Sequence, residues 1–248
     1  MKNLINKIDI LEEQIYRVEM KQGYIKEEKK IKNIKGNIPI ERLPFKMDSL
    51  KKFIDPETMS YHYNKHYIGN VNKLNDILSK EKKKNLELEA IIEKIDEYGK
   101  DVRNNAGGAY NHAIFWKMLS PKQMEPNGPI LKIIERTFGG IRNFTKKFEE
   151  AAKERFGSGW VWLVLNDDNI IKIMTTENQD NPLMNIIQNG GYVLIGLDLW
   201  EHAYYLTYRN KKEKYVENFW RVINWDYINQ RFIERQAKNN DSRKSNNS

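Results

Sequence analysis

The chain has no cysteine among its 248 residues. Disulfide bonds are therefore excluded, and so are thiolate ligands to a metal ion. Any metal bound by this protein must be held by nitrogen and oxygen donors. The absence of cysteine does not by itself identify a cellular compartment.

Long apolar runs are also missing. No stretch approaches the ~18 apolar residues of a membrane-spanning helix, and residues 1–20 lack the uninterrupted apolar core of a secretory signal peptide. A mitochondrial presequence is poor in acidic residues, whereas Asp9, Glu12 and Glu13 occur early in this chain. We therefore expect a cytoplasmic protein without a membrane anchor.

Acidic side chains are in the minority. The chain carries 42 Lys and Arg against 34 Asp and Glu, which gives a formal net charge of +8. Such a field attracts small anions, and it also produces a nonspecific affinity for nucleic acid that falls steeply with salt. No basic patch is interleaved with stacking aromatics, and no nucleic-acid-binding fold signature is present. We expect no specific nucleic-acid binding.

Histidine is scarce as well, yet all four histidines lie among aromatic residues: His62, His66, His112 and His202. A single histidine in such surroundings is usually a packed core residue, but four of four are hard to attribute to packing alone. Asp198 stands four residues before His202, so both side chains can converge on one point if the backbone is helical or turns. In isolation that spacing would indicate only an N-capping Asp and a core His.

The combination of carboxylate and imidazole indicates a metal site. Hard carboxylate and borderline imidazole ligands suit manganese or iron in the divalent or trivalent state. Three neutral imidazoles and one carboxylate leave a five-coordinate ion one open position for solvent or substrate, which distinguishes a catalytic site from a closed structural one. The pattern therefore predicts a catalytic manganese or iron centre.

From about residue 42 to residue 235 the chain resembles the iron/manganese superoxide dismutase family. The matching segments come in the family's order and spacing: LPF (43–45), YHYNKH (61–66), NNAGG (104–108), NH (111–112), FGSGWVWLV (156–164), DLWEHAYY (198–205), NFW (218–220) and NW (224–225). The resemblance implies an antioxidant enzyme that converts superoxide to dioxygen and hydrogen peroxide by redox cycling of one bound ion per subunit.

The resemblance also implies roles for individual residues. The metal ligands would be His62, His112, Asp198 and His202. A dry aromatic shell around them would come from Trp116, Trp160 and Trp162.

The identity of the metal follows, by resemblance, from the position of one glutamine beside the metal-bound solvent. Iron-type members usually supply it four residues before the second His ligand, where this chain has Gly108. Manganese-type members supply it from the C-terminal half, in a segment similar to residues 178–183. Gln179 therefore looks like this glutamine, and manganese is favoured, with iron as the alternative.

Two positions depart from the family pattern. Where the family has a tyrosine at the substrate entrance, hydrogen-bonded to the active-site water and Gln, this chain has Asn70, a shorter amide without a phenol proton. We expect metal binding and the first half-reaction to survive this change, and proton delivery and peroxide release to differ. At a basic position of the entrance that is usually Arg, the chain has Lys212, which keeps the charge but loses the planar fork.

The resemblance further implies an assembly of subunits, a homodimer or a tetramer. His66 would pair with Tyr205 of the partner subunit, and Glu201 would reach the partner's His202 across a two-fold axis. A rival interpretation is a noncatalytic scaffold or interaction protein that kept the fold, motivated by the N-terminal extension and Asn70. Metal content and superoxide-dismutating activity of the purified protein discriminate between the two.

The predicted fold class is α+β, with a helical hairpin followed by helices packed on a three-stranded antiparallel sheet. The predicted divisions are an extension over residues 1–40 (an amphipathic helix and a Lys-rich linker), a hairpin domain over 41–125, a metal-binding domain over 126–236 and a disordered tail over 237–248. Helices are expected to open at Asp55 and to cover residues 86–119, 129–138, 141–156, 212–223 and 226–236. Strands are expected over residues 160–165, 170–175 and 192–197.

Overall fold

The computed structural model describes residues 38–81 and 86–246. The predicted amphipathic helix near the N-terminus, the Lys-rich linker and the turn over residues 82–85 lie outside the described residues. Within the described part of the chain, no helix is both long and apolar enough to cross a membrane. The described residues cluster as one compact unit.

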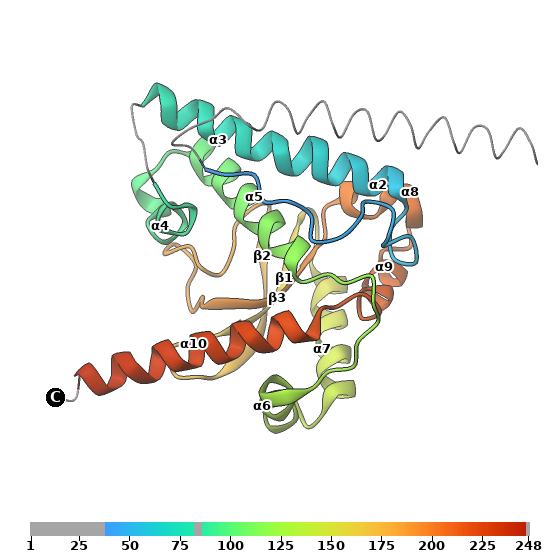
Figure 1. The fold of residues 1–248 in the computed structure, drawn as a ribbon, viewed down its shortest axis with the longest axis vertical. Helices are drawn as coiled ribbons and strands as arrows, with labels where there is room; N and C mark the ends of the chain where they lie inside the picture. The colour runs from blue at the N-terminus through green and yellow to red at the C-terminus, as the bar shows by residue number, and fades with distance from the viewer. Residues whose placement is uncertain (1–37, 82–85, 247–248) are drawn as a thin grey trace, which may run out of the picture. The chain divides into compact units, whose positions relative to one another are not determined.

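The helical hairpin opens at Asp55, as predicted. The Asp55 carboxylate accepts a hydrogen bond from the Thr58 backbone N–H at 2.8 Å, and Pro56 occupies the first helical turn. The first arm of the hairpin consists of α2 (Pro56–Ser60), the π-helix η1 (Tyr61–Tyr67) and α3 (Ile68–Lys80). Its α3 packs along α5 (Lys100–Lys117), the second arm (Figure 1).

The second arm is shorter than the sequence pattern predicts. The expected helix over residues 86–119 is divided into α4 (Leu88–Glu93), a short 3₁₀ turn η2 (Ile95–Glu97) and α5. The prediction is wrong here because Tyr98 and Gly99 adopt extended backbone angles, so that Gly99 becomes the N-cap of a new helix. Apolar residues continue on both sides of this break, and periodicity alone does not reveal it.

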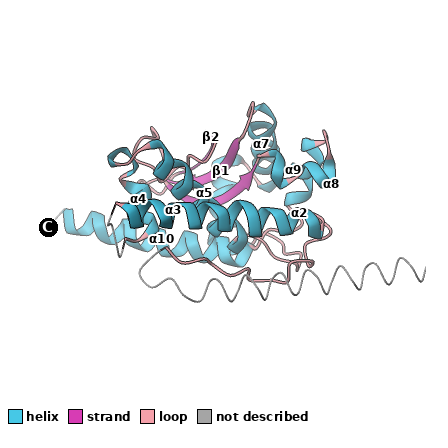
Figure 2. Ribbon diagram, turned by 90° about the horizontal axis from the view of Figure 1, so that it is seen from above, coloured by secondary structure: helices cyan, strands magenta, loops and turns pink. Residues whose placement is uncertain are grey.

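The second half of the described chain contains the predicted sheet. Helices α6 (Gly128–Phe138) and α7 (Ile141–Glu154) precede three antiparallel strands in the order β2-β1-β3. Their bounds are β1 (Gly159–Leu165), β2 (Ile171–Glu177) and β3 (Tyr192–Asp198). The central strand β1 is buried along its whole length, and helices from both halves of the chain surround the sheet (Figure 2). The predicted α+β class is confirmed.

One cross-strand pair fixes how closely β1 and β3 approach. Trp162 lies opposite Gly196, and a Cβ atom at position 196 would come within 2.3 Å of the Trp162 ring. Only glycine therefore leaves room for this indole inside the sheet. The same register places Trp160 opposite Asp198, at the strand end that carries the candidate ligand.

After β3 the chain forms four helical segments: η3 (Glu201–Ala203), α8 (Tyr205–Tyr208), α9 (Lys212–Phe219) and α10 (Trp225–Asn246). The predicted disorder is wrong for residues 237–246, since α10 continues to Asn246, and residues 247–248 lie outside the described residues. Asn239 is only 6% exposed, and its amide donates to the Asn166 carbonyl at 3.1 Å and to Asn169 Oδ1 at 2.9 Å. A side-chain amide, instead of an apolar group, attaches this end of the helix to the turn between β1 and β2.

Candidate metal centre

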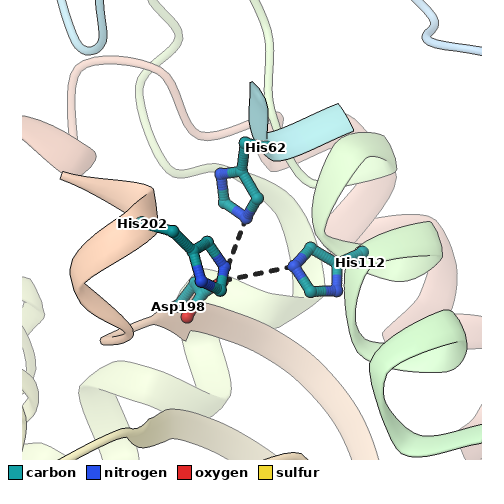
Figure 3. Close-up of side chains that lie close together, drawn as sticks. All are labelled: His62, His112, Asp198 and His202. Atoms are coloured by element: carbon teal, nitrogen blue, oxygen red, sulfur yellow. Dashed lines mark hydrogen bonds and ion pairs between the residues drawn. The ribbon is translucent and has the colours of Figure 1, made fainter. Parts of the chain in front are cut away.

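The four predicted ligands come from four separate elements and meet at one point. His62 lies in the π-helix η1, His112 in α5, Asp198 at the end of β3 and His202 in the 3₁₀ turn η3. Figure 3 shows the three imidazole rings pointing toward the Asp198 carboxylate from different directions. Segments 136 residues apart in the sequence are thereby joined at a single position.

The convergence is on one oxygen atom. The Nε2 atoms of His62, His202 and His112 lie 3.0, 3.2 and 3.4 Å from Asp198 Oδ2. One ligand atom of each residue lies within 4.8 Å of the other three. His62, His112 and Asp198 are completely buried, and His202 is nearly so.

The outer hydrogen bonds of these residues prepare them to bind a cation. His112 Nδ1 lies 2.7 Å from the Gly108 carbonyl, to which it must donate its proton, so its Nε2 carries the lone pair. That Nε2 has no hydrogen-bond partner among the described residues, although it is buried. The Trp200 backbone N–H donates to Asp198 Oδ1 at 2.9 Å, which directs Oδ2 toward the three rings. A manganese or iron ion fits this set of nitrogen and oxygen donors.

Burial sets the charge of the ligands. It lowers the pKa of His62 from 6.5 to about 3, and repulsion by the other two imidazoles acts in the same direction. Burial alone would raise the pKa of Asp198, but electrostatic attraction from His202 and the polar contacts with the surrounding imidazoles outweigh it and hold this pKa well below 3.8. At neutral pH the site therefore offers a neutral His62 imidazole and a carboxylate anion to a metal.

Buried indoles surround the ligand rings. The Trp116 ring lies 4.8 Å from His62, Trp160 lies 5.4 Å from His112 in an edge-to-face contact, and Trp162 stacks on Trp160 at 5.1 Å. All three indoles have no exposed surface. The region predicted to be a dry aromatic shell is thus filled by aromatic carbon, which excludes water from this side of the ligands and strengthens electrostatic interactions there.

Gln179 lies in the loop after β2 and is 8% exposed. Its Oε1 accepts hydrogen bonds from Asn111 Nδ2 and from Trp160 Nε1, both at 3.2 Å. Because Oε1 already accepts these two hydrogen bonds, the Nε2 group of Gln179 is the part of the side chain that remains for a further hydrogen bond, as a donor. Asn111 was not singled out from the sequence as a site residue, although its position directly before His112 was a signal that could have been used.

Asn70 and Gly108 lie against each other across the hairpin. A Cβ atom at position 108 would come within 2.1 Å of Asn70 Nδ2, so the Asn70 amide packs directly on the glycine backbone. Asn70, which the resemblance places at the substrate entrance, therefore packs against the helical turn that precedes His112. Lys212, by contrast, donates from Nζ to the Arg155 carbonyl at 3.1 Å.

Three of the residues predicted to meet a partner subunit lie at the surface of this single chain: His66, Glu201 and Tyr205. His66 is exposed, and its ring stacks on His202 at 3.8 Å. Glu201 is exposed, and Tyr205 is 47% exposed. Within one chain the structure brings His66, but not Tyr205, into contact with a ligand ring.

The low pKa of His62 predicts a pH dependence of stability for the metal-free protein. Below pH 6.5 the unfolded chain takes up a proton at this imidazole that the folded chain refuses until about pH 3. Stability is therefore unaffected by this residue above pH 6.5 and falls between pH 6.5 and 4, by about 1.4 kcal/mol per pH unit for one such proton. Urea unfolding of chelator-treated protein at pH 7 and pH 5 measures the difference.

The matched control is His62→Gln, because an amide does not titrate. Its unfolding free energy should fall less between pH 7 and pH 5 than that of the unsubstituted chain. The same fall in both proteins would contradict the assignment. The lowered pKa of Asp198 does not interfere, since its stabilising contribution is lost only as the pH falls below about 3.8.

Comparison with known proteins agrees with the geometry along most of the chain. Residues 37–120 match the model of the alpha-hairpin domain of iron/manganese superoxide dismutases, and residues 126–231 match the C-terminal domain of the same family. Superoxide dismutase (Mn) 3 of Leptolyngbya boryana is 44% identical over 196 residues, which cover 77% of this chain and 80% of that protein. Superoxide dismutase (Mn) of Escherichia coli strain K12 is 43% identical over 201 residues, 78% of this chain and 97% of that protein. The chain belongs to the iron/manganese superoxide dismutases.

Proposed function

We propose that this protein disproportionates superoxide with one manganese ion, held by His62, His112, Asp198 and His202. The observation that carries the proposal is the convergence of three imidazole nitrogens on one buried carboxylate oxygen. The choice of metal is supported by the names of the two relatives, both of which are manganese superoxide dismutases. Iron, which the family also accepts, is the alternative ion.

A bound ion would supply the one-electron redox couple that the reaction needs, since manganese and iron each have a trivalent and a divalent state. The overall reaction converts two superoxide anions and two protons to one dioxygen and one hydrogen peroxide. Three neutral imidazoles and a single carboxylate keep the charge of the site low in both states, so that an anion can enter.

The surrounding residues have positioning tasks in this proposal. Gln179 has its Oε1 engaged by Asn111 and Trp160, so its Nε2 group remains as the donor for a solvent molecule bound to the ion. Such a donor adjusts the balance between the two redox states. The indoles of Trp116 and Trp160 keep bulk water away from the ligand rings. The net charge of +8 attracts the anionic substrate to the molecule.

Metal analysis and an activity assay on the same purified sample test the function. We expect one manganese per chain and superoxide-dismutating activity that a chelator removes. Asp198→Asn, which removes the only carboxylate of the set, should lower the metal affinity by more than about 100-fold, the upper end of the loss that follows removal of an outer hydrogen-bond partner. Reconstitution with manganese and with iron in parallel compares the activity of the two loaded forms.

The control for Asp198→Asn is Asp167→Asn, in the exposed turn between β1 and β2. It makes the same chemical change outside the candidate centre and should leave metal content and activity unchanged. An unsubstituted chain that is metal-free and inactive after reconstitution would contradict the enzyme and favour the noncatalytic scaffold.

Asn70 is proposed to alter how protons reach the reduced product. A phenol can give up a proton, whereas a carboxamide can only hydrogen-bond, so this chain lacks one acid that its relatives would have at this position. The contact between Asn70 and Gly108 places the amide beside the turn that leads to His112. Binding of the ion does not depend on Asn70, because all four ligand atoms belong to other residues.

Asn70→Tyr should therefore bind metal as before and turn over faster. Turnover at saturating superoxide should rise several-fold, below the ~10²–10⁴-fold contribution of a fully used general acid. Asn70→Phe is the matched control, since it adds the ring without the hydroxyl group. Equal turnover of the Tyr and Phe variants, measured by stopped-flow kinetics, would disprove the role in proton delivery.

The enzyme is also proposed to work as a homodimer, or as a tetramer built from such dimers. Glu201, His202, His66 and Tyr205 would form the contact, with Tyr205 of the partner subunit beside His66. The exposure of large apolar side chains at this end of the sheet supports the proposal. Phe156 is 92% exposed, and three residues later the Gly159 carbonyl accepts a hydrogen bond from Leu199, next to the ligand segment.

Phe156→Ser should weaken the dimer. Burying one phenylalanine contributes about 1.5–3 kcal/mol, so the dissociation constant should rise by at least roughly tenfold. Ile170→Ser is the control, because Ile170 is 56% exposed in the turn between β1 and β2. Sedimentation velocity over a dilution series measures both variants. A chain that sediments as a monomer at every concentration would refute the proposed assembly.

A further inference from the structure

Helix α5 presents one row of residues to the loop that carries Gln179. Arg103, Gly107 and Asn111 follow each other at intervals of four, and residues so spaced lie on one face of a helix. Each of the three meets the loop over residues 178–181. The next residue after Asn111 is His112, so the same helix positions a metal ligand and holds the loop.

The contacts at the ligand end of this row are neutral. Asn111 Nδ2 donates to the Gln179 carbonyl at 3.0 Å and its Oδ1 accepts from Asn181 Nδ2 at 3.0 Å. A Cβ atom at position 107 would lie 2.1 Å from the Gln179 carbonyl oxygen, so the loop backbone rests directly on the helix backbone there. The Gln179 backbone is thus held close to α5 from two sides.

The contact at the other end is ionic and bidentate. Arg103 donates from Nε to Asp180 Oδ1 at 2.8 Å and from Nη2 to Asp180 Oδ2 at 2.5 Å. The Asp180 side chain is 13% exposed and that of Arg103 is 41% exposed. A pair so accessible to water contributes little to stability, but its two parallel hydrogen bonds fix the orientation of the carboxylate.

The remaining bonds of Asp180 hold the loop to its own strand. The Asp180 backbone N–H donates to the Glu177 carbonyl at 2.9 Å, and Thr176 Oγ1 donates to the Asp180 carbonyl at 2.6 Å. These bonds determine the shape of the loop without connecting it to α5. The guanidinium of Arg103 is the charged connection between the helix that bears His112 and the residue next to Gln179.

We propose that Arg103 is a positioning residue, which holds the Gln179 carboxamide in place relative to the metal centre through its bidentate pair with Asp180. This inference rests on the proposed function, because it gives Gln179 a task beside a bound ion. If Arg103 is lost, Asp180 is released on the side of α5, and the adjacent Gln179 is held to this helix by its neutral contacts with Asn111 and Gly107 alone. The ligands themselves keep their positions, since none of them contacts Arg103.

The test compares manganese-loaded Arg103→Gln and Asp180→Asn, which break the pair from opposite sides. Both should retain one manganese per chain. Both should shift the visible absorption of the trivalent form, the reduction potential and the pH profile of turnover in the same direction. Turnover should fall by about 10-fold, the lower end of what outer partners of a metal centre contribute. Arg103→Lys keeps the charge without the fork and should recover only part of the loss.

The control is Arg235→Gln. Arg235 pairs with Asp167 through Nη2 and Oδ1 at 2.9 Å, with an Arg side chain that is 31% exposed, at the turn between β1 and β2. It should change neither spectrum nor potential. If Arg103→Gln and Asp180→Asn lower only the melting temperature and leave spectrum, potential and pH profile unchanged, Arg103 is merely structural and the inference is overturned. An unsubstituted chain without manganese or activity would instead overturn the proposed function.

Discussion

The structure depends on one oxygen atom, Asp198 Oδ2, on which the Nε2 atoms of three imidazoles converge at 3.0–3.4 Å. A fully buried carboxylate is expensive unless positive charge or hydrogen bonds compensate it. The imidazoles that surround it are buried or nearly so, and the hydrogen bond from His112 Nδ1 to the Gly108 carbonyl leaves the lone pair of His112 Nε2 facing the centre. The arrangement therefore reaches its full stability with a cation at its centre, and folding and metal binding favour the same geometry.

Two adjacent glycines on α5 connect this centre with its surroundings. Gly107 admits the carbonyl of Gln179, and Gly108 admits the amide of Asn70. Each contact is possible only because no side chain intervenes, so α5 is held between the loop after β2 on one side and α3 on the other. The polar environment of the ligands therefore depends on the two glycines, which have no Cβ atom, as much as on the amide groups that pack against them. A single methyl group at either position would displace one of these amides.

Much of the fold and the centre could be predicted from the sequence, because both depend on residue type and spacing. The rarity of histidine indicated a metal site, the resemblance to the family indicated which four residues are its ligands, and apolar runs of the right lengths indicated three strands. The break before Gly99, the helical end at Asn239 and the pair of Arg103 with Asp180 could not be predicted. None of these features leaves a periodic signal in the sequence. The first consists of extended backbone angles, the second is held by a side-chain amide in place of apolar residues, and the third joins residues that are 77 positions apart.

The π-helical segment η1, which carries His62 and His66, has a consequence for how this chain can change in length. Its wider turns hold more residues than an α-helix of the same rise would. Deleting one residue there would restore a regular α-helix and leave the residues beyond it in nearly the same orientation, because the wide turn accommodates one extra residue. The contact of Asn70 with the Gly108 backbone would then persist. The same deletion within α3 would instead rotate everything beyond it by about 100° around the helix axis. A change in length is therefore better tolerated in η1 than in the regular helix that follows it.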